Sequence, residues 1–342
     1  MRALFALGIA AFAATLAFTA DDKDKKPGQQ PQATGQANSN VKITPRTKGK
    51  NPADAESITD RQTNLRIDTT LVLIPVSVTD PLGRFVTNLD KENFKLWEDK
   101  VEQEIAQFSS EDAPLSVCIV FDTSGSMGSK LQRSRVAVAQ FMRTANPEDE
   151  FCLITFNDRP ELMVPFTPST EEIQNRLTFA NAKGRTALLD GIYLAMNTMK
   201  KARNPRKAIL IISDGGDNSS RYTTSEVQMA VREADVQIYA IGIYESMGGR
   251  GRTPEESSGP ELLSRMAEQT GGRHFNVDNQ AELPDVAAKI GIELRNQYVL
   301  GYRPKNLTRD GKYRRVNVKL VNTTGLGQLK AMFRTGYYAP TQ

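Results

Sequence analysis

The sequence predicts an α/β fold: a doubly wound, mostly parallel sheet, flanked by β strands that form a small sandwich. Between about residues 115 and 296, apolar strand-like runs alternate with helical repeats. That alternation is typical of a parallel sheet covered by helices. Before and after this region only strand and turn signals occur. We therefore divide the folded chain into residues 65–114, 115–296 and 297–338.

Five strands and six helices are expected in the central region. The strand candidates are Ser116–Phe121, Glu150–Asn157, Glu161–Phe166, Lys207–Ser213 and Val236–Tyr244. The second and third are close enough in sequence for a hairpin, which predicts one antiparallel edge strand. The first three helices are predicted from one apolar face (Leu131, Val138, Phe141, Met142), a capping box (Ser169, Glu172) and a second face (Leu188, Leu189, Ile192, Met196, Met199). The remaining helices are expected at Thr224–Ala234, Pro260–Thr270 and Gln280–Arg295.

The flanking segments contain β signals that are too few on each side to make a stable layer alone. Residues Leu71–Thr79 alternate as a half-buried strand, and Pro75 implies an edge or a bulge. Further strands are expected at Phe94–Glu98, Glu102–Phe108, Tyr298–Tyr302, Tyr313–Leu320 and Leu329–Thr335. We infer that the two groups pack together as one sandwich around the inserted α/β domain. The alternative is two independent flaps.

The N-terminus is expected to lie outside the fold. Residues 1–20 contain one arginine followed by an apolar stretch with small residues at its end, as in a secretory signal peptide. An uncleaved membrane anchor is the alternative, and no other integral membrane segment is expected. Residues 21–64 contain few large apolar side chains, so a disordered linker is predicted. The protein is therefore expected to be exported, either to the periplasm or outside the cell.

Composition excludes several functional classes. The net charge of +4 is small for 342 residues, and no basic patch with interleaved aromatic residues argues for nucleic-acid binding. A single histidine, His274, makes zinc hydrolysis and Ser-His-Asp catalysis improbable, and we expect it on the surface or against a neighbouring strand. Cys118 and Cys152 lie in apolar runs, which favours buried thiols. A disulfide would require neighbouring strands, and parallel neighbours seldom have the geometry for one.

The segment Asp122-Thr123-Ser124-Gly125-Ser126 follows the first central strand and places hard oxygen donors two residues apart. Such oxygens suit Mg²⁺ or Mn²⁺ better than zinc or copper. The carboxyl ends of strands are where open α/β sheets bind ligands. Thr186 follows a glycine loop, and Asp214 follows the strand Lys207–Ser213. The pattern predicts a metal site that faces a partner.

These three segments resemble the von Willebrand factor type A domain and its metal-ion-dependent adhesion site. The resemblance covers about Ser116–Arg295, and the flanking strands extend it to bacterial exported VWFA-related proteins. It implies that Ser124 and Ser126 bind the cation directly, and that Thr186 does so directly or through water. It implies that Asp122 and Asp214 hold ligating waters. The expected cation is Mg²⁺, with Mn²⁺ or Ca²⁺ as alternatives, and a partner's Asp or Glu would complete its coordination.

Simpler interpretations exist for each segment. Asp122, Ser124 and Ser126 could cap the following helix, Thr186 could be an N-cap, and Asp214 could belong to a turn. Asp217 is a candidate contact for the partner, although a turn-forming role is favoured. Arg250 and Arg252, in a glycine-rich loop after a strand, are candidates for contacting an acidic partner, although a solvated loop without that role is favoured.

The function favoured by these observations is a non-catalytic, exported interaction or adhesion module that depends on a divalent cation. A cell-envelope scaffold with a structural metal is the first alternative. A metal-assisted hydrolase is the second, but no base or nucleophile stands out beside the site carboxylates.

Overall fold

The computed structural model describes residues 71–244, 254–323, 325 and 327–341, with the backbone alone for residues 254–257. The predicted signal peptide (1–20), the predicted linker (21–64) and both loop arginines, Arg250 and Arg252, lie outside the described residues. All the described residues belong to a single unit. Among them, no helix combines the length and apolarity needed to cross a membrane.

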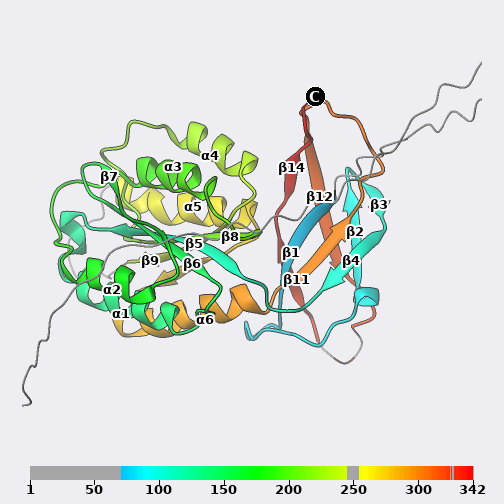
Figure 1. The fold of residues 1–342 in the computed structure, drawn as a ribbon, viewed down its shortest axis with the longest axis horizontal. Coiled ribbons are helices and arrows are strands. Elements are labelled where there is room, and N and C mark those ends of the chain that lie inside the picture. The colour runs from blue at the N-terminus through cyan, green and yellow to red at the C-terminus, as the bar shows by residue number, and fades with distance from the viewer. Residues whose placement is uncertain (1–70, 245–253, 324, 326, 342) are drawn as a thin grey trace, which may run out of the picture. The chain divides into compact units, whose positions relative to one another are not determined.

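A six-stranded sheet forms the centre of the α/β domain (Figure 1). Its strands are β5 (Leu115–Asp122), β6 (Glu150–Phe156), β7 (Pro160–Thr167), β8 (Arg206–Ser213), β9 (Gln237–Ile243) and β10 (His274–Val277). They lie in the order β10-β9-β8-β5-β6-β7, and every neighbouring pair is parallel except β6 with β7. The predicted fold class, with one antiparallel edge strand, is confirmed.

Helices cover both faces of this sheet. They are α1 (Leu131–Met142), α2 (Thr170–Thr178), α3 (Leu188–Met199), α4 (Thr224–Glu233), α5 (Pro254–Gln269) and α6 (Leu283–Arg295). In Figure 1, α1, α2 and α6 lie on one side of the sheet, and α3, α4 and α5 lie on the other. Each group buries its own cluster of apolar side chains against the strands.

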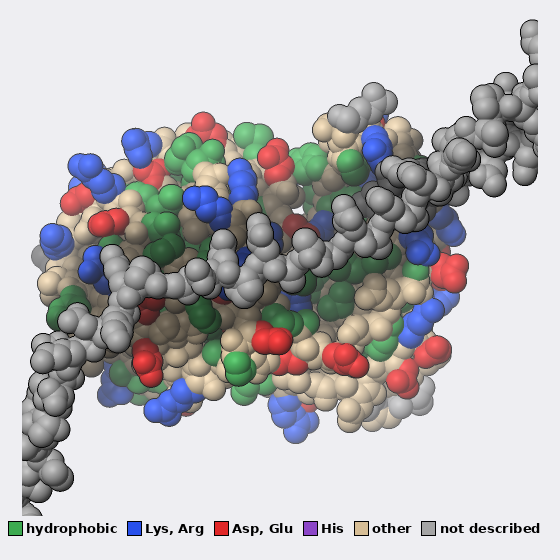
Figure 2. Space-filling model, in the orientation of Figure 1, with side chains coloured by type: hydrophobic (Ala, Val, Ile, Leu, Met, Phe, Trp, Pro, Cys, Tyr) green, Lys and Arg blue, Asp and Glu red, His purple; other side chains and the backbone are tan. Residues whose placement is uncertain are grey.

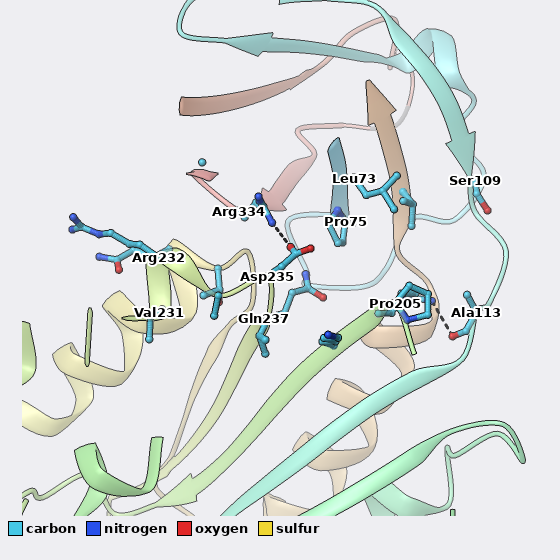
Figure 3. A pocket seen from close by; sticks show the side chains of 18 of the residues that line it. Leu73, Pro75, Ser109, Ala113, Pro205, Val231, Arg232, Asp235, Gln237 and Arg334 are labelled. Carbon is cyan, nitrogen blue, oxygen red and sulfur yellow. Dashed lines mark hydrogen bonds and ion pairs between the residues drawn. The ribbon is translucent and has the colours of Figure 1, made fainter. Parts of the chain in front are cut away.

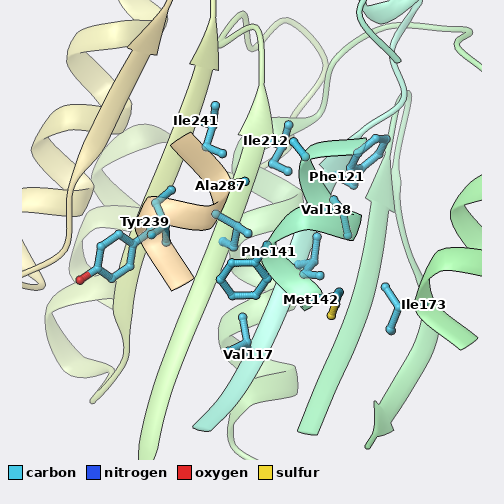
Figure 4. Close-up of a cluster of buried hydrophobic side chains, with 14 of the residues drawn as sticks. Val117, Phe121, Val138, Phe141, Met142, Ile173, Ile212, Tyr239, Ile241 and Ala287 are labelled. Atoms are coloured by element: carbon cyan, nitrogen blue, oxygen red, sulfur yellow. The ribbon is translucent and has the colours of Figure 1, made fainter. Parts of the chain in front are cut away.

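The apolar cluster between the sheet and helices α1 and α6 contains the residues whose spacing predicted α1. Figure 4 shows side chains of α1 and α6 facing those of the central strands; those labelled include Val138, Phe141, Met142, Ala287, Val117, Phe121, Ile212 and Ile241. All four apolar residues predicted for one face of α1 are buried. A spacing of three or four residues puts them on one side of the helix, so that side faces the sheet.

The start of α5 differs from the prediction. The helix was expected at Pro260–Thr270, with Pro260 as its first residue, a position that proline favours. Pro254 takes that position instead, and Pro260 lies inside α5. There its ring nitrogen cannot donate to the preceding turn, so one backbone carbonyl loses its usual helical partner.

Two four-stranded sheets are built from strands on both sides of the α/β domain (Figure 1). One has the order β13-β1-β11-β4, the other β14-β12-β2-β3. The strands are β1 (Val72–Thr79), β2 (Phe94–Glu98), β3 (Val101–Gln103), β4 (Ile105–Ser109), β11 (Tyr298–Tyr302), β12 (Tyr313–Leu320), β13 (Lys330–Phe333) and β14 (Gly336–Tyr338). They share one apolar cluster, so the predicted sandwich is confirmed.

Local details of the sandwich explain two features of the sequence. The predicted strand Glu102–Phe108 is divided into β3 and β4, and β14 was not foreseen. Pro75 pairs with Val299 of β11, while β13 pairs only with the later part of β1. The proline therefore lies where β1 has a neighbour on one side only, which is the local edge that its missing N–H requires.

Cys118 and Cys152 form a disulfide, so the expectation of buried free thiols is wrong. β5 and β6 are neighbours, and Cys118 stands opposite Cys152 in their register. Their Cα atoms are 4.6 Å apart, within the range that a disulfide can bridge. The sequence did not specify this register, and it is the register that brings the two sulfur atoms together.

The visible face of the molecule carries charges of both signs, and the single histidine is half-buried. On the face in Figure 2, outside the part covered by grey atoms, Lys and Arg side chains are interspersed with Asp and Glu. His274 begins β10 and is half-buried, with its ring centroid 6.0 Å from that of Tyr244. Burial lowers the pKa of His274, so its neutral form is favoured.

Candidate metal centre

Three loops at the carboxyl edge of the six-stranded sheet are joined by backbone hydrogen bonds. The amide of Gly125, after β5, donates to Gly184 O at 3.0 Å, in the loop before α3. Thr186 O accepts from the amide of Asn218, after β8, at 3.0 Å. Parallel strands end at the same edge, so these loops meet although they are far apart in the sequence.

Asp122 ends β5 and has no exposed surface. Its Oδ1 accepts a hydrogen bond from the backbone N–H of Ser124 at 2.8 Å, and its Oδ2 accepts from Ser213 Oγ at 2.6 Å. Burial, followed by the negative charge of Asp214, raises the pKa of Asp122 to about 7. A buried acid next to a second acid is stabilised by a nearby cation.

Ser124 and Ser126 place two hydroxyl oxygens side by side. Their Oγ atoms are 3.1 Å apart and hydrogen-bonded to each other. Ser124 is almost fully buried, while Ser126 is exposed, so the pair reaches from the interior to the surface. Ser124 precedes the 3-10 turn Gly125–Met127, but its side chain makes no capping hydrogen bond. The alternative that Ser124 is only a cap is therefore wrong.

Thr186 is held in place through both its backbone N–H and its backbone carbonyl. Its N–H donates to Asn218 Oδ1 at 3.0 Å, and its carbonyl accepts from the same residue's amide. The preceding residue is also fixed, because the amide of Arg185 donates to Asp158 Oδ1 at 2.9 Å. The N-cap of α3 is Ala187, so the alternative that Thr186 caps this helix is wrong as well. The Thr186 side chain is buried, 5% exposed.

Asp214 is paired with a lysine that the sequence reading did not single out. Lys130 Nζ lies 3.1 Å from Asp214 Oδ2, and both side chains are about nine-tenths buried. Lys130 immediately precedes α1, whereas Asp214 follows β8. The ammonium group offsets part of the negative charge that Asp122 and Asp214 bring to this edge.

Asp217 faces the neighbouring helix. Its Oδ1 accepts from Ser220 Oγ at 2.6 Å and, at 3.4 Å, from the amide of Leu189 in the first turn of α3. Burial raises the pKa of Asp217. These contacts agree with the turn-forming role that the sequence favoured for it.

Two residues that support the site, Ser213 and Lys130, were missed by sequence reasoning. Ser213 donates to Asp122, and Lys130 pairs with Asp214. Asn218, which the sequence suggested as a residue that tunes the site or binds a second cation, with turn formation favoured, positions Thr186 instead. Ser213 immediately precedes the predicted Asp214, so its place at the end of β8 was a usable signal. Nothing in the sequence marks Lys130, because its pairing depends on how the start of α1 meets the end of β8.

The donor set fits a hard divalent cation. In an octahedral Mg²⁺ site with oxygens at about 2.1 Å, adjacent ligands are about 3 Å apart. The Ser124 and Ser126 hydroxyl oxygens are 3.1 Å apart, a spacing compatible with two adjacent ligands of such an ion. Among the described residues, no three His, Cys, Asp or Glu side chains gather as a metal cluster. The hydroxyl groups of Ser124, Ser126 and Thr186 belong to the predicted donor set together with Asp122 and Asp214.

Comparison with known proteins agrees with this architecture. Residues 117–216 match the family described as von Willebrand factor type A domain. The chain is 28% identical over 132 residues to the inter-alpha-trypsin inhibitor heavy chain H4 of Sus scrofa, covering 35% of this chain and 14% of that one. It is 24% identical over 206 residues to an uncharacterized protein of Borreliella burgdorferi, covering 53% and 60%. The chain thus spans about a seventh of the porcine relative and three fifths of the bacterial one.

Among solved structures, the von Willebrand factor type A protein from Catenulispora acidiphila has a TM-score of 0.47 and 13% identity, covering 71% of this chain and 73% of that one. The matched segment, 117–216, runs from β5 through β8 and includes the Asp122, Thr186 and Asp214 loops. The chain therefore contains a von Willebrand factor type A domain.

Proposed function

We propose that this protein is an exported, non-catalytic interaction or adhesion module that binds an acidic group of a partner protein through a divalent cation. The cation would be held by Asp122, Ser124, Ser126, Thr186 and Asp214, in the manner of a metal-ion-dependent adhesion site. Mg²⁺ is the preferred ion, with Mn²⁺ or Ca²⁺ as alternatives. The carboxylate of a partner's Asp or Glu would complete the coordination.

The observation that supports this most directly is the pair of hydroxyls 3.1 Å apart, one buried and one exposed, beside the buried Asp122. Mg²⁺ usually keeps several exchangeable waters and takes few protein ligands. An exposed position next to Ser126 suits the replacement of such a water by a partner's carboxylate. The cation would supply a positive charge that a carboxylate recognises.

The disulfide between Cys118 and Cys152 supports the proposed export. Disulfides persist in oxidising compartments, such as the periplasm and the extracellular space, and are rare in the cytosol. The predicted signal peptide at residues 1–20 leads to the same proposal.

The metal part of the proposal is tested by titrating the chelator-treated protein with MgCl₂ in a calorimeter. Wild type is expected to bind one ion, and Ser124→Ala is expected to weaken binding by at least about tenfold. Ser110→Ala is a matched control, because Ser110 is exposed and lies outside the site. Equal affinity in all three proteins would contradict the assigned ligands.

The partner part is tested by capture from an envelope fraction in Mg²⁺ and in EDTA. Mg²⁺-dependent capture that Ser124→Ala abolishes is expected. If the metal were only structural, as in a scaffold, EDTA would lower the melting temperature but leave capture intact. A metal-assisted hydrolase would instead turn over a substrate, which requires a base or nucleophile beyond the carboxylates named here.

Residues at the rim are proposed to tune partner affinity. Arg250 and Arg252 would attract an acidic partner, and Asp217 would contribute from the Asp214 loop. A double variant, Arg250→Ala and Arg252→Ala, is expected to capture less of the partner. Its capture should also fall less than that of wild type when the salt concentration is raised. Unchanged affinity would remove the loop from the proposal.

A further inference from the structure

A second site is present at the opposite edge of the six-stranded sheet. A cavity of about 230 Å³ lies where the first residues of β8 and β9 meet the sandwich strands β1 and β11. Figure 3 shows Leu73 and Pro75 on one side of this cavity and Gln237 on the other. The metal-site loops follow the carboxyl ends of the same strands, so the two sites are separated by the length of the sheet.

Four residues that line the cavity each have a buried polar side-chain atom with no hydrogen-bond partner among the described residues. The four atoms are Arg206 Nε, Gln237 Nε2, Gln269 Oε1 and Arg334 Nε. Gln237 is 7% exposed, so its amide is removed from bulk water. Leaving buried polar groups unpaired is costly, and several of them around one cavity indicate something polar that binds there. Three of the four atoms are hydrogen-bond donors, so a ligand that pairs with them must contain hydrogen-bond acceptors.

The two arginines are held in place by other contacts. Arg206 donates to Gln297 Oε1 at 3.2 Å and to the carbonyl of Leu294. Arg334 is paired with Asp235, as the dashed line in Figure 3 shows. Both side chains are at most 14% exposed. Fixed donors in a partly desolvated site interact with an anion more strongly than mobile surface lysines do.

The remaining lining sets the character of the ligand. Four cationic side chains, Arg206, Lys207, Arg232 and Arg334, line the cavity together with two acidic ones, Glu111 and Asp235. Asp112 lies outside the lining but pairs with Arg206 at 3.8 Å, so the formal excess is one positive charge. Apolar side chains, including those of Leu73, Val236 and Val299, supply the rest of the wall. A ligand that fits has an anionic acceptor group and a short apolar body.

We propose that this cavity binds a small monocarboxylate with an aliphatic or aromatic body. If each ligand atom takes no more than the ~30 Å³ of a liquid water molecule, there is room for about eight non-hydrogen atoms. The carboxylate would accept from Gln237 Nε2 and the two arginine Nε–H groups, while the body packs on Leu73 and Val299. This proposal does not rest on the metal centre or on the proposed function.

The test uses hexanoate as the probe, added to the full chain in EDTA and followed by calorimetry. Saturable binding with Kd of about 1 mM or tighter is expected for eight ligand atoms. Hexanamide has the same size without the charge, and should bind at least about tenfold more weakly. The comparison between these two probes needs no variant, so it holds even if a substitution disturbs folding.

Variants assign the binding to this cavity. Gln237→Leu should weaken hexanoate binding by about tenfold or more, whereas Gln132→Leu, on the exposed side of α1, should not change it. Ser124→Ala should also bind hexanoate normally, which separates the result from failure of the metal site. The proposal is overturned by equal binding of hexanoate and hexanamide. It is also overturned by no saturation up to about 10 mM, or by a crystal structure with hexanoate in which only ordered water occupies the cavity.

Discussion

At the scale of single residues, the site is organised by how charges are balanced in the interior. Burial and the negative charge of Asp214 raise the pKa of Asp122, and the Lys130 ammonium group pairs with Asp214 at 3.1 Å. A bound cation would therefore act on a site whose charge is already partly offset. Lys130 thus sets how much electrostatic attraction is left for a metal ion.

We predict that Lys130→Met tightens Mg²⁺ binding by about tenfold, because it removes one positive charge a few ångströms from the proposed ion. The same variant should melt at a lower temperature in EDTA, since Asp214 would lose its buried partner. Calorimetric titration measures the first effect, and thermal denaturation with and without Mg²⁺ measures the second. Weaker Mg²⁺ binding in a folded variant would show that Lys130 helps to build the site instead.

The candidate ligands were predicted from residues that directly follow a strand or a glycine loop. Asp122, Ser124 and Ser126 follow one strand, so their spacing alone predicted oxygen ligands. Lys130 forms its contact through packing between α1 and β8, and no local pattern encodes that. The same limit applies to Cys118 and Cys152, whose pairing depends on a strand register that periodicity does not fix.

At the scale of elements, helix α5 packs against the Asp214 loop through two glycines. Gly215 has a positive φ of +85°. A Cβ added to Gly259 of α5 would lie only 2.0 Å from the carbonyl oxygen of Gly215. The helix and the loop can therefore approach this closely only because neither residue has a side chain.

Gly259→Ala is expected to push the Asp214 loop away from α5 and to weaken Mg²⁺ binding by about tenfold. Gly128→Ala is the matched control, because a Cβ there would meet no atom closer than 3.5 Å. Titration with MgCl₂ and a melting curve on each variant check the prediction. If both variants bound Mg²⁺ like wild type, the loop would be free to move without affecting the site.

The disulfide joins β5 to β6 across 34 residues of sequence. Closing a loop of that length lowers the entropy of the unfolded chain, so the bridge is expected to contribute about 3–4 kcal/mol to stability. The double variant Cys118→Ala and Cys152→Ala should lose about that amount in urea denaturation. A loss below about 1 kcal/mol would mean that the apolar packing of these strands compensates for the bridge.

Most elements could be predicted because their patterns are local. The alternating and continuous apolar runs located β1, β5, β8 and β9, and Ser169 marked the start of α2, where its side chain does accept from Glu172. The start of α5 could not be predicted, because a proline is compatible both with the first turn of a helix and with its interior when neighbouring packing outweighs one lost hydrogen bond. Short β14 lacks a pattern long enough to read.

At the scale of the whole molecule, the α/β domain and the sandwich share buried polar contacts. Gln297 is 1% exposed, and its Nε2 donates to Ser77 Oγ of β1 at 3.1 Å and to the Tyr239 hydroxyl of β9 at 3.2 Å. The Tyr239 hydroxyl in turn donates to Oε1 of the buried Glu293 of α6 at 3.1 Å. One hydrogen-bond network therefore joins the two layers, the α/β domain and the sandwich.

We predict that the wild-type protein unfolds in one calorimetric transition, because breaking this network would leave buried polar groups unpaired in both layers. Gln297→Leu should cost about 1–3 kcal/mol and broaden or divide the transition. Gln132→Leu on the exposed side of α1 serves as the control. Two separated transitions in the wild type, with no change in Gln297→Leu, would show that the layers unfold independently.

The chain passes from β4 into the α/β domain and returns from it into β11, and these two strands are direct antiparallel neighbours, with Ser109 opposite Val299. Any tension applied at the metal-bearing end would consequently reach the sandwich along two adjacent strands pulled in the same direction. Their mutual hydrogen bonds would carry little shear. The mechanical load would fall instead on the pairing of β11 with β1, the strand that lies on its other side.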